Sequence, residues 1–433
     1  MKIILFRAKK VHEQFNFSIN FNNDLNFITG INGTGKTTAL KLMKAAITFD
    51  LHILISISFS TLTMEIEHAG KLYSIEIQKK NGAITINLND NIINIEDALL
   101  NESSNLVYEN HRDFIDSLFH NKIINGNEIY RSFLKEIKPL FLGLDRQMDY
   151  SDDDEYFLKN HYISRRIKAE RKPNVDGLEN CKKLIEDAYR KYRRVSDGSL
   201  DRIVSVIIGS SFDYIDIDHS EIFSSHFSPR VELQKLKERQ EDLQTFTSRI
   251  GLSHQASKQI DKFFTQMSEA LNNYDSERGE HVGIEWLINL AQIKRIKDVI
   301  SEIDRQKKAA EAYLSPIEDY TATINKFLKH SNKNLQVDKV GQVIIYGHNG
   351  KTIDINNLSS GEKQILILLT HARLGNNKNR VFIVDEPELS LHLKWQEMLV
   401  DELIKDAHNV QFICATHSPE IVGYHVEKCI KVS

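Results

Sequence analysis

The sequence predicts an α/β fold with a flanking antiparallel β layer and an inserted α-helical lobe. Three observations predict this fold. A glycine-rich loop near residue 30 joins an apolar strand pattern to a helical pattern, two stretches alternate apolar and polar residues around Asn-Gly pairs, and the middle of the chain repeats apolar residues at helical spacing. The 433 residues are enough for two domains, or for one large domain with an insertion.

Two β-rich stretches, residues 1–25 and 55–88, lie on either side of the loop and its helix. Asn81-Gly82 separates two alternating runs in the second stretch, and both residues tolerate the positive φ of a type I′ turn. We therefore expect a hairpin there, and an antiparallel layer beside the sheet that carries the loop. The alternating apolar residues are Ile3, Leu5, Phe15, Phe17, Ile19, Phe21, Leu62, Met64, Ile66, Tyr73, Ile75, Ile77, Ile84, Ile86 and Leu88.

The rest of the chain has a helical middle and a mixed end. Residues 107–119 and 128–137 look helical, and residues 140–144 resemble a short buried strand. From 174 to 327, apolar residues follow helical spacing without a sustained heptad, which predicts a helical lobe or a short antiparallel hairpin in place of a long coiled-coil arm. A second hairpin at Asn349-Gly350 is expected from the same turn chemistry.

The composition indicates a soluble globular protein, with 41% hydrophobic and 27% charged residues. The net charge of -4 gives no global sign of nucleic-acid binding. Three scattered cysteines are too few for a disulfide framework or a metal site, which favours a reducing cytosol. No apolar run suits a signal peptide or a bilayer span, so we expect a cytoplasmic protein without a membrane partner.

The glycine-rich loop has the phosphate-binding pattern, because Gly30 and Gly35 bracket four residues and precede Lys36 and Thr37. Its amides and the following helix N-terminus would cradle an anion, with Lys36 on the β- and γ-phosphates of ATP and the Thr37 hydroxyl on Mg²⁺. The alternative is a chance glycine-rich turn. The residues that would bind the nucleotide are Asn32, Gly33, Thr34, Gly35, Lys36, Thr37 and Thr38.

A second candidate motif, Ser359-Ser360-Gly361-Glu362, precedes a helical pattern at residues 365–374. An ordinary capping box between Ser359 and Glu362 would by itself explain these residues. The heptapeptide 358–364 also resembles the signature motif of ATP-binding-cassette (ABC) ATPases, in the serine-rich form of chromosome-maintenance and DNA-repair relatives. The resemblance implies that this helix start contacts a γ-phosphate.

Residues 381–386 form an apolar strand pattern that ends in two carboxylates and resembles the second acidic motif of phosphate-loop ATPases. Asp385 would hold Mg²⁺ through its water shell, and Glu386 would polarise the attacking water as a general base. A turn or a helix cap is the plainer explanation of such a pair. A last core strand at 411–415 ends before His417, which resembles the family's switch histidine, although a lone histidine after a strand is usually structural.

Together the motifs resemble those of ABC-type ATPases of the RecF, structural-maintenance-of-chromosomes (SMC) and overcoming-lysogenization-defect group, which are AAA-type ATP-binding proteins. They also resemble ATPase subunits of antiphage systems such as Septu, retron and PARIS operons. The resemblance implies an α/β, ABC-type P-loop NTPase head with an inserted helical lobe. The implied parts are 1–173 for the N-terminal part of the head, 174–327 for the helical insertion, and 328–433 for the C-terminal part.

The resemblance further implies an ATPase that converts ATP and water to ADP and phosphate, with Lys36, Glu386 and His417 as catalytic residues and Mg²⁺ on Thr37 and Asp385. One head's phosphate loop would face another head's signature, so we expect a homodimer or a larger homo-oligomer. Gln147 is a candidate for the glutamine that links Mg²⁺ to the helical lobe, and Arg146 is the alternative. Because 16 residues follow His417, a nuclease or toxin effector would be a separate partner.

Three functions stay open at this point. The first is an ATPase that controls an effector in bacterial antiphage defence, the second a DNA-repair ATPase that clamps DNA directly, and the third an ATP-bound scaffold with little turnover. Basic clusters at 165–172 and 190–194 could bind a DNA backbone, or could be solvated helix faces balanced by nearby acids.

Overall fold

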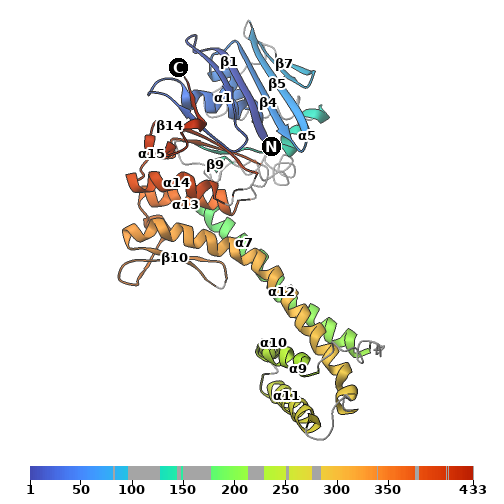
Figure 1. Cartoon of the computed structure of the whole chain (residues 1–433). Helices are drawn as coiled ribbons and strands as arrows, with labels where there is room; N and C mark the ends of the chain where they lie inside the picture. The colour runs from blue at the N-terminus through green and yellow to red at the C-terminus, as the bar shows by residue number, and fades with distance from the viewer. Residues whose placement is uncertain are drawn as a thin grey trace, which may run out of the picture. The chain divides into compact units, whose positions relative to one another are not determined.

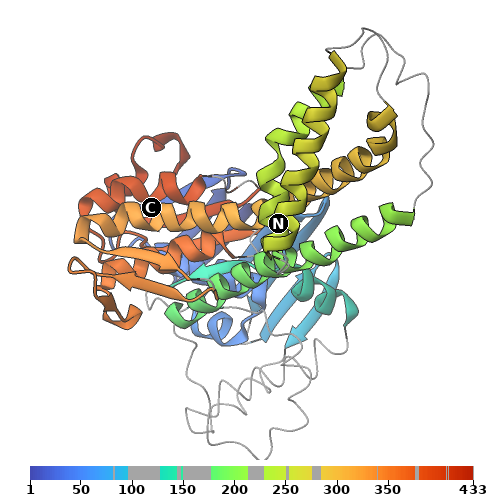
Figure 2. The same ribbon diagram turned by 90° about the horizontal axis from the view of Figure 1, so that it is seen from below.

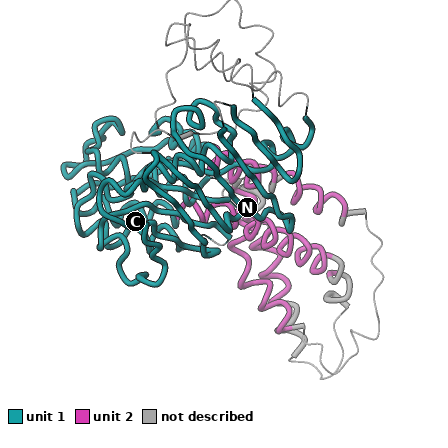
Figure 3. The backbone as a smooth tube through the Cα atoms, turned by 90° about the horizontal axis from the view of Figure 1, so that it is seen from above, with its two compact units in different colours: residues 1–186, 319–433 teal, residues 187–318 magenta. Residues whose placement is uncertain are grey.

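The computed structural model describes twelve stretches of the chain: residues 1–80, 83–95, 127–143, 148–149, 177–212, 229–249, 253–275, 284–338, 340–375, 380–405, 407 and 409–432. The chain divides into two compact units (Figure 3). The first contains residues 1–186 and 319–433, and the second contains residues 187–318, which lie inside the segment predicted to be a helical insertion.

An antiparallel sheet forms one layer of the first unit, with the strand order β2-β1-β4-β5-β6-β7 (Figure 1). Except for β7, these strands lie in the stretches whose alternating patterns predict them, and buried residues alternate with less buried ones along most of β2, β4 and β6. β5 and β6 form the predicted hairpin, whose turn at residues 81–82 lies outside the described residues. The strands are β1 (Lys2–Val11), β2 (Phe15–Asn20), β4 (Thr61–His68), β5 (Lys71–Lys80), β6 (Ala83–Leu88) and β7 (Asn91–Ile95).

A second sheet carries the motifs, with the order β15-β3-β14-β13-β8-β9. Neighbouring strands are parallel except for the edge strand β9, which is antiparallel to β8. The prediction of a short buried strand near residue 140 is confirmed by β8. The strands are β3 (Leu25–Thr29), β8 (Leu140–Leu142), β9 (Met148–Asp149), β13 (Val381–Asp385), β14 (Gln411–Thr416) and β15 (Cys429–Lys431).

The parallel sheet is buried on both faces, so its central strands are mostly apolar. On one face Ile383 and Ile413 join a core that includes the antiparallel sheet and helix α1 (Lys36–Thr48). On the other face Phe382 and Phe412 join a core formed with α13 (Ser360–Arg373) and α14 (Leu393–Ile404), which lie side by side (Figures 1 and 2). The two cores hold the sheet rigidly beneath the motif-bearing loops.

Short elements complete the first unit. Helix α5 (Glu128–Glu136) confirms the helix predicted at 128–137, whereas the one predicted at 107–119 lies outside the described residues. Helix α2 (Leu51–Ser56), capped by Asp50, replaces the start of the predicted β-rich stretch at Ile55. The last short elements are η4 (Ile355–Asn357), α15 (Pro419–Val422) and η5 (Val426–Lys428).

A three-stranded antiparallel sheet, with the order β10-β11-β12, contains the second predicted hairpin. The expected type I′ turn is wrong, because only Gly350 has a positive φ and the Gly350 amide closes the turn on the Gly347 carbonyl. The loop between β11 and β12 is longer than the two residues of a type I′ hairpin, so the chain adopts a different turn there. The elements are η3 (Lys329–Ser331), β10 (Asn334–Val337), β11 (Val343–Tyr346) and β12 (Thr352–Ile353).

The second unit is helical, and its own core is formed by side chains such as Leu236, Phe264 and Ile300. Two helices that contribute to it are longer than the short apolar runs suggest, with 36 and 45 residues. Pro316 lies inside the longer helix without ending it. The helices are α7 (Gly177–Phe212), α9 (Pro229–Glu238), α10 (Gln240–Arg249), α11 (Ser253–Asp275) and α12 (Ile284–Leu328). Among the helices that the structure describes, none combines the length and apolar character needed to cross a membrane.

Candidate functional site

Three neighbouring strands bring the predicted motifs to one edge of the parallel sheet. β14 lies between β3 and β13, with Thr416 opposite Thr29 and Ala415 opposite Asp385. Because the strands are parallel, the loops that follow them leave from the same edge. The phosphate loop after β3, Glu386 after β13 and His417 after β14 therefore lie at neighbouring strand ends.

The phosphate loop is shaped by its glycines and threonine. Gly35 has a φ of 83° and precedes α1 without any side-chain cap, so the first amides of that helix have no side-chain acceptor. A Cβ on Gly30 would lie 2.7 Å from the Thr34 Oγ1 and 2.8 Å from the Val432 carbonyl oxygen. The Thr34 hydroxyl donates to the Ile31 carbonyl at 2.9 Å. Contacts within the loop therefore fix its shape next to the N-terminus of α1, which has no side-chain cap.

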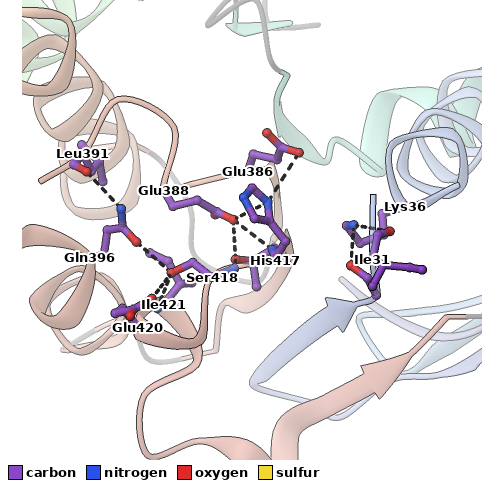
Figure 4. A network of polar contacts seen from close by, with 12 residues as sticks. Ile31, Lys36, Glu386, Glu388, Leu391, Gln396, His417, Ser418, Glu420 and Ile421 are labelled. Carbon is purple, nitrogen blue, oxygen red and sulfur yellow. Dashed lines mark hydrogen bonds and ion pairs between the residues drawn. The ribbon is translucent and has the colours of Figure 1, made fainter. Parts of the chain in front are cut away.

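Lys36 is buried in this loop, although it carries a charge. Its Nζ donates to the carbonyl oxygens of Gly30 at 2.8 Å and Ile31 at 3.2 Å (Figure 4). These two bonds use two of the three ammonium donors and hold the group beside the helix N-terminus. The contact places a positive charge where an anion would meet the α1 amides.

Asp385, the last residue of β13, is a buried carboxylate with unused acceptor capacity. Its Oδ1 is buried without a hydrogen-bond partner among the described residues. The pKa of Asp385 is raised to about 6, mainly by burial and to a smaller extent by the neighbouring charge of Glu386. A hydrogen bond with Thr37 and the charges of Lys41 and Lys36 act in the opposite direction. Oxygen ligands from Asp385 and Thr37 suit Mg²⁺, so the residues present fit that ion.

Glu386 and His417 face each other from adjacent strand ends. Glu386 adopts a left-handed backbone with a φ of 48°, and its amide donates to the Ala415 carbonyl at 2.9 Å, which continues the ladder one residue past β13. The His417 Nδ1 lies 3.8 Å from a carboxylate oxygen of Glu386. Both side chains are partly exposed, so each is accessible to water and ligands. A strained backbone at this position is typical of functional sites.

A third carboxylate, Glu388, contacts His417 more closely. The sequence resemblance assigns residues 388–392 to the loop that crosses the dimer interface of ABC-type ATPases, and it predicts no contact between Glu388 and His417. Its Oε1 accepts hydrogen bonds from the Thr416 hydroxyl at 2.7 Å and the His417 amide at 2.9 Å. A hollow of about 440 Å³ beside these groups is lined by Glu386, Glu388, Leu389, Ser390, Leu391, Gln396, His417, Ser418, Pro419 and Glu420.

The signature residues are built into the start of α13. The Ser359 hydroxyl accepts from the Glu362 amide and the Glu362 carboxylate accepts from the Ser359 amide, so the capping box is present. Ser359 and Ser360 are exposed, whereas Glu362 is buried and pairs with Lys333 at 2.7 Å. A Cβ on Gly361 would lie 2.5 Å from the Ser390 carbonyl oxygen.

In the described part of the chain, no hydrogen bond or ion pair joins these signature residues to the predicted catalytic groups Lys36, Glu386 and His417, or to the predicted metal ligand Asp385.

Some predicted residues cannot be placed. Arg146, Gln147 and the basic cluster at 165–172 lie outside the described residues. The other basic cluster is on α7, where Arg190 pairs with Asp187 and Arg193 pairs with Asp197, both at 3.4 Å. Cys414 is buried inside β14.

Comparison with known proteins assigns the chain to a family. A family model described as the AAA ATPase domain matches residues 12–422. The retron Vc95 probable ATPase of Vibrio cholerae serotype O1 biovar El Tor is 28% identical over 188 residues, which cover 40% of this chain and 30% of that protein. The retron Ec83 probable ATPase of Escherichia coli is 33% identical over 99 residues, which cover 20% of this chain and 18% of that protein. The chain therefore spans less than a third of the length of these relatives.

Solved structures of SMC head domains are also similar. The Smc head domain with an extended coiled coil from Pyrococcus furiosus has a TM-score of 0.39 and 13% identity, covering all of this chain and 93% of that chain. The SMC head domain from Thermotoga maritima has a TM-score of 0.38 and 11% identity, covering all of this chain and 95% of that chain.

Proposed function

The chain belongs to the AAA ATPase domain family, and from this premise we propose that it binds ATP with Mg²⁺ and hydrolyses ATP to ADP and phosphate. The observation that carries the proposal is the convergence of the phosphate loop, Asp385, Glu386 and His417 at three neighbouring strand ends. Glycine-rich loops, a basic residue and strand-end carboxylates are the parts that phosphoryl transfer requires.

Each group has a role in this proposal. The uncapped amides of α1 and the Lys36 ammonium bind the phosphates, while Thr37 and Asp385 hold Mg²⁺, which when bound neutralises phosphate charge. Glu386 accepts a proton from water as the water oxygen bonds to the γ-phosphorus and the bond from that phosphorus to the ADP oxygen breaks. His417 contacts the γ-phosphate from the adjacent strand end.

We also propose that the site is completed by a second copy of the chain. Ser359 and Ser360 are exposed at the N-terminus of α13, and within the described residues they make no bond to the phosphate loop. An exposed hydroxyl at a helix N-terminus suits the γ-phosphate bound by another copy. ATP would then stabilise a homodimer or a larger homo-oligomer, and hydrolysis would release it.

The biological role that we propose is control of a separate effector, a nuclease or toxin, in bacterial antiphage defence. The support is the similarity to two retron probable ATPases. Direct DNA clamping has less support, because two arginines of the α7 basic cluster are paired with aspartates.

The test of the ATPase proposal is phosphate release from Mg²⁺-ATP by the wild-type chain and by Glu386→Gln. We expect kcat to fall by roughly 100-fold or more, as for the loss of a general base, with ATP affinity retained. Glu397→Gln, an exposed carboxylate on α14, is the matched control and should keep wild-type turnover. Equal turnover in Glu386→Gln and wild type would refute the assigned base.

The composite site is tested by sedimentation of Glu386→Gln with ATP. Hydrolysis is blocked in this variant, so the ATP-bound form should accumulate as a dimer or a larger species. A strict monomer at saturating ATP would refute the second-copy proposal. Adding Ser359→Arg, which places a bulky cation at the proposed contact, should return the Glu386→Gln variant to the monomer.

A further inference from the structure

One carboxylate at the site has no part in the mechanism above, although it makes the closest contacts to His417. Glu388 is 94% buried and its Oε1 is the shared acceptor of the Thr416 hydroxyl and the His417 amide (Figure 4). The same oxygen lies 3.2 Å from the His417 ring Nδ1. The Glu388 carboxylate therefore contacts both the backbone and the ring of His417.

The turn after β13 places Glu388 there. Glu386 leaves the strand with a positive φ, and the Leu389 amide donates back to the Glu386 carbonyl at 3.0 Å, so the chain reverses within four residues. This reversal brings the Glu388 side chain against the end of β14. The contact joins residues 28 and 29 positions apart in the sequence, which explains why no local pattern reveals it.

The two oxygens of Glu388 are used unequally. All three contacts are to Oε1, whereas Oε2 is buried without a hydrogen-bond partner among the described residues. Leaving a buried carboxylate oxygen unpaired destabilises the fold, so such a group calls for an explanation. The three contacts at Oε1 fix the carboxylate in the orientation that leaves Oε2 unpaired.

The neighbouring carboxylates are bound differently. Glu386 is 3.8 Å from the same ring nitrogen, which is beyond hydrogen-bond distance, so it stays free to accept a proton from water. Glu420 lines the same hollow but accepts from the Ser418 hydroxyl at 2.9 Å. Of these three carboxylates, Glu388 is the one within hydrogen-bond distance of the His417 ring nitrogen.

We propose that Glu388 is the positioning residue of His417: its Oε1 fixes the His417 amide and faces Nδ1, which leaves Nε2 as the ring nitrogen available to the γ-phosphate. This inference rests on the proposed ATPase function. In this proposal Glu388 acts only through His417.

The test is a kinetic comparison of two Glu388 variants in the full-length chain. Glu388→Met keeps the length of the side chain and removes both oxygens, and it should lower kcat by about 10- to 100-fold, the usual effect of losing an orienting partner. KM for ATP and the affinity for ATP should change by less than about threefold, since Glu388 acts only through His417 in this proposal. Glu388→Gln keeps an oxygen at the Oε1 position and should restore kcat to within about fivefold of wild type. Glu397→Gln, at an exposed carboxylate of α14, is the control and should match wild type.

A double-mutant cycle separates positioning from a merely structural role. If Glu388 acts through His417, then Glu388→Met combined with His417→Ala should be no slower than His417→Ala alone. Multiplicative losses in the double variant would overturn the proposal, as would wild-type kcat in Glu388→Met. If Glu388→Met does not fold, a loss of tenfold or more in Glu388→Gln would still overturn the role of Oε1. A wild-type chain that binds ATP but releases no phosphate would overturn the proposed ATPase function itself, whereas an active wild type with an unaffected Glu388→Met overturns this role alone.

Discussion

Helices α1 and α13 both begin at a motif predicted to contact ATP phosphate, but their N-termini are completed in opposite ways. α1 begins after Gly35, which is left-handed and provides no side-chain cap. α13 begins after Ser359 in a reciprocal capping box with Glu362. Both helix dipoles favour an anion, yet only α1 leaves its first amides without a side-chain acceptor. The free amides at the start of α1 therefore suit an anion, whereas the signature residues cap and stabilise the start of α13.

The carboxylates beside the two helices show the same contrast. Asp385, next to α1, has a buried oxygen without a partner among the described residues, and burial raises its pKa to about 6. Burial also acts to raise the pKa of Glu362 in α13, but hydrogen bonds from Lys333, Ser331 and the Ser359 amide hold that pKa below its ordinary value. Asp385 retains capacity for a cation, whereas Glu362 is already satisfied by the protein.

The largest effect that separates the two helices should come from Lys36→Ala. Its Nζ is held beside the α1 N-terminus, and removing a charge-assisted phosphate contact should weaken ATP binding by about 3 kcal/mol, roughly 100-fold or more. Titration calorimetry measures this loss. Lys71→Ala, at an exposed lysine of β5, should bind ATP like wild type. Wild-type affinity in Lys36→Ala would show that the α1 N-terminus is not the anion site.

The constraint on Gly35, which precedes α1 and provides no side-chain cap, can be tested by a pair of alanine variants. Gly35 and Gly33 both have a positive φ, so each substitution should cost about 1–2 kcal/mol in the free energy of unfolding. A Cβ at Gly35 would also lie 2.9 Å from the Phe17 ring, whereas none of the surrounding atoms comes within 4 Å of one at Gly33.

We therefore expect Gly35→Ala to be the less stable of the two by about 1 kcal/mol or more, from overpacking against that ring. Urea unfolding measures the difference. Equal stability of the two variants would mean that Phe17 does not constrain the loop.

The two carboxylates predict opposite responses to pH in buffer without Mg²⁺ or nucleotide. Asp385 has a folded-state pKa of about 6 against 3.8 ordinarily, so its contribution to stability is fully present below pH 4 and is lost as the pH rises through 6. Asp385→Asn should therefore raise the free energy of unfolding by about 2 kcal/mol at pH 7.5 and change it little at pH 4. Urea unfolding at the two pH values measures this change.

Glu362→Gln is the matched comparison, because the Glu362 pKa is lowered in the folded state. Its stabilising contribution is present at neutral pH and is lost as the pH falls through the folded pKa, so this variant should be less stable than wild type at pH 7.5. A loss of stability at pH 7.5 in Asp385→Asn as well would remove the contrast between the two carboxylates.

The sequence predicts some parts of the fold and of the site but not others, depending on whether the residues involved are neighbours in the chain. The phosphate loop, the acidic strand end and the hairpins are predictable because their residues are neighbours in the chain and local geometry requires them. The positions of Glu388 and Lys333 depend on contacts across 28 and 29 residues, which no local pattern encodes. The length of α12 was missed because its apolar residues face different cores at its two ends.

The smallest expected effect belongs to Ser359→Ala, which tests whether the signature is more than a helix cap. Loss of the N-cap hydroxyl should cost about 1 kcal/mol in the free energy of unfolding, because the Glu362 amide loses its acceptor. Ser359→Asp keeps an acceptor at the cap and should recover that stability, but its negative charge would repel a γ-phosphate. If the signature contacts ATP, both variants should turn over ATP more slowly while their monomers bind it normally. Wild-type turnover in Ser359→Asp would instead make the capping box the whole role of this residue.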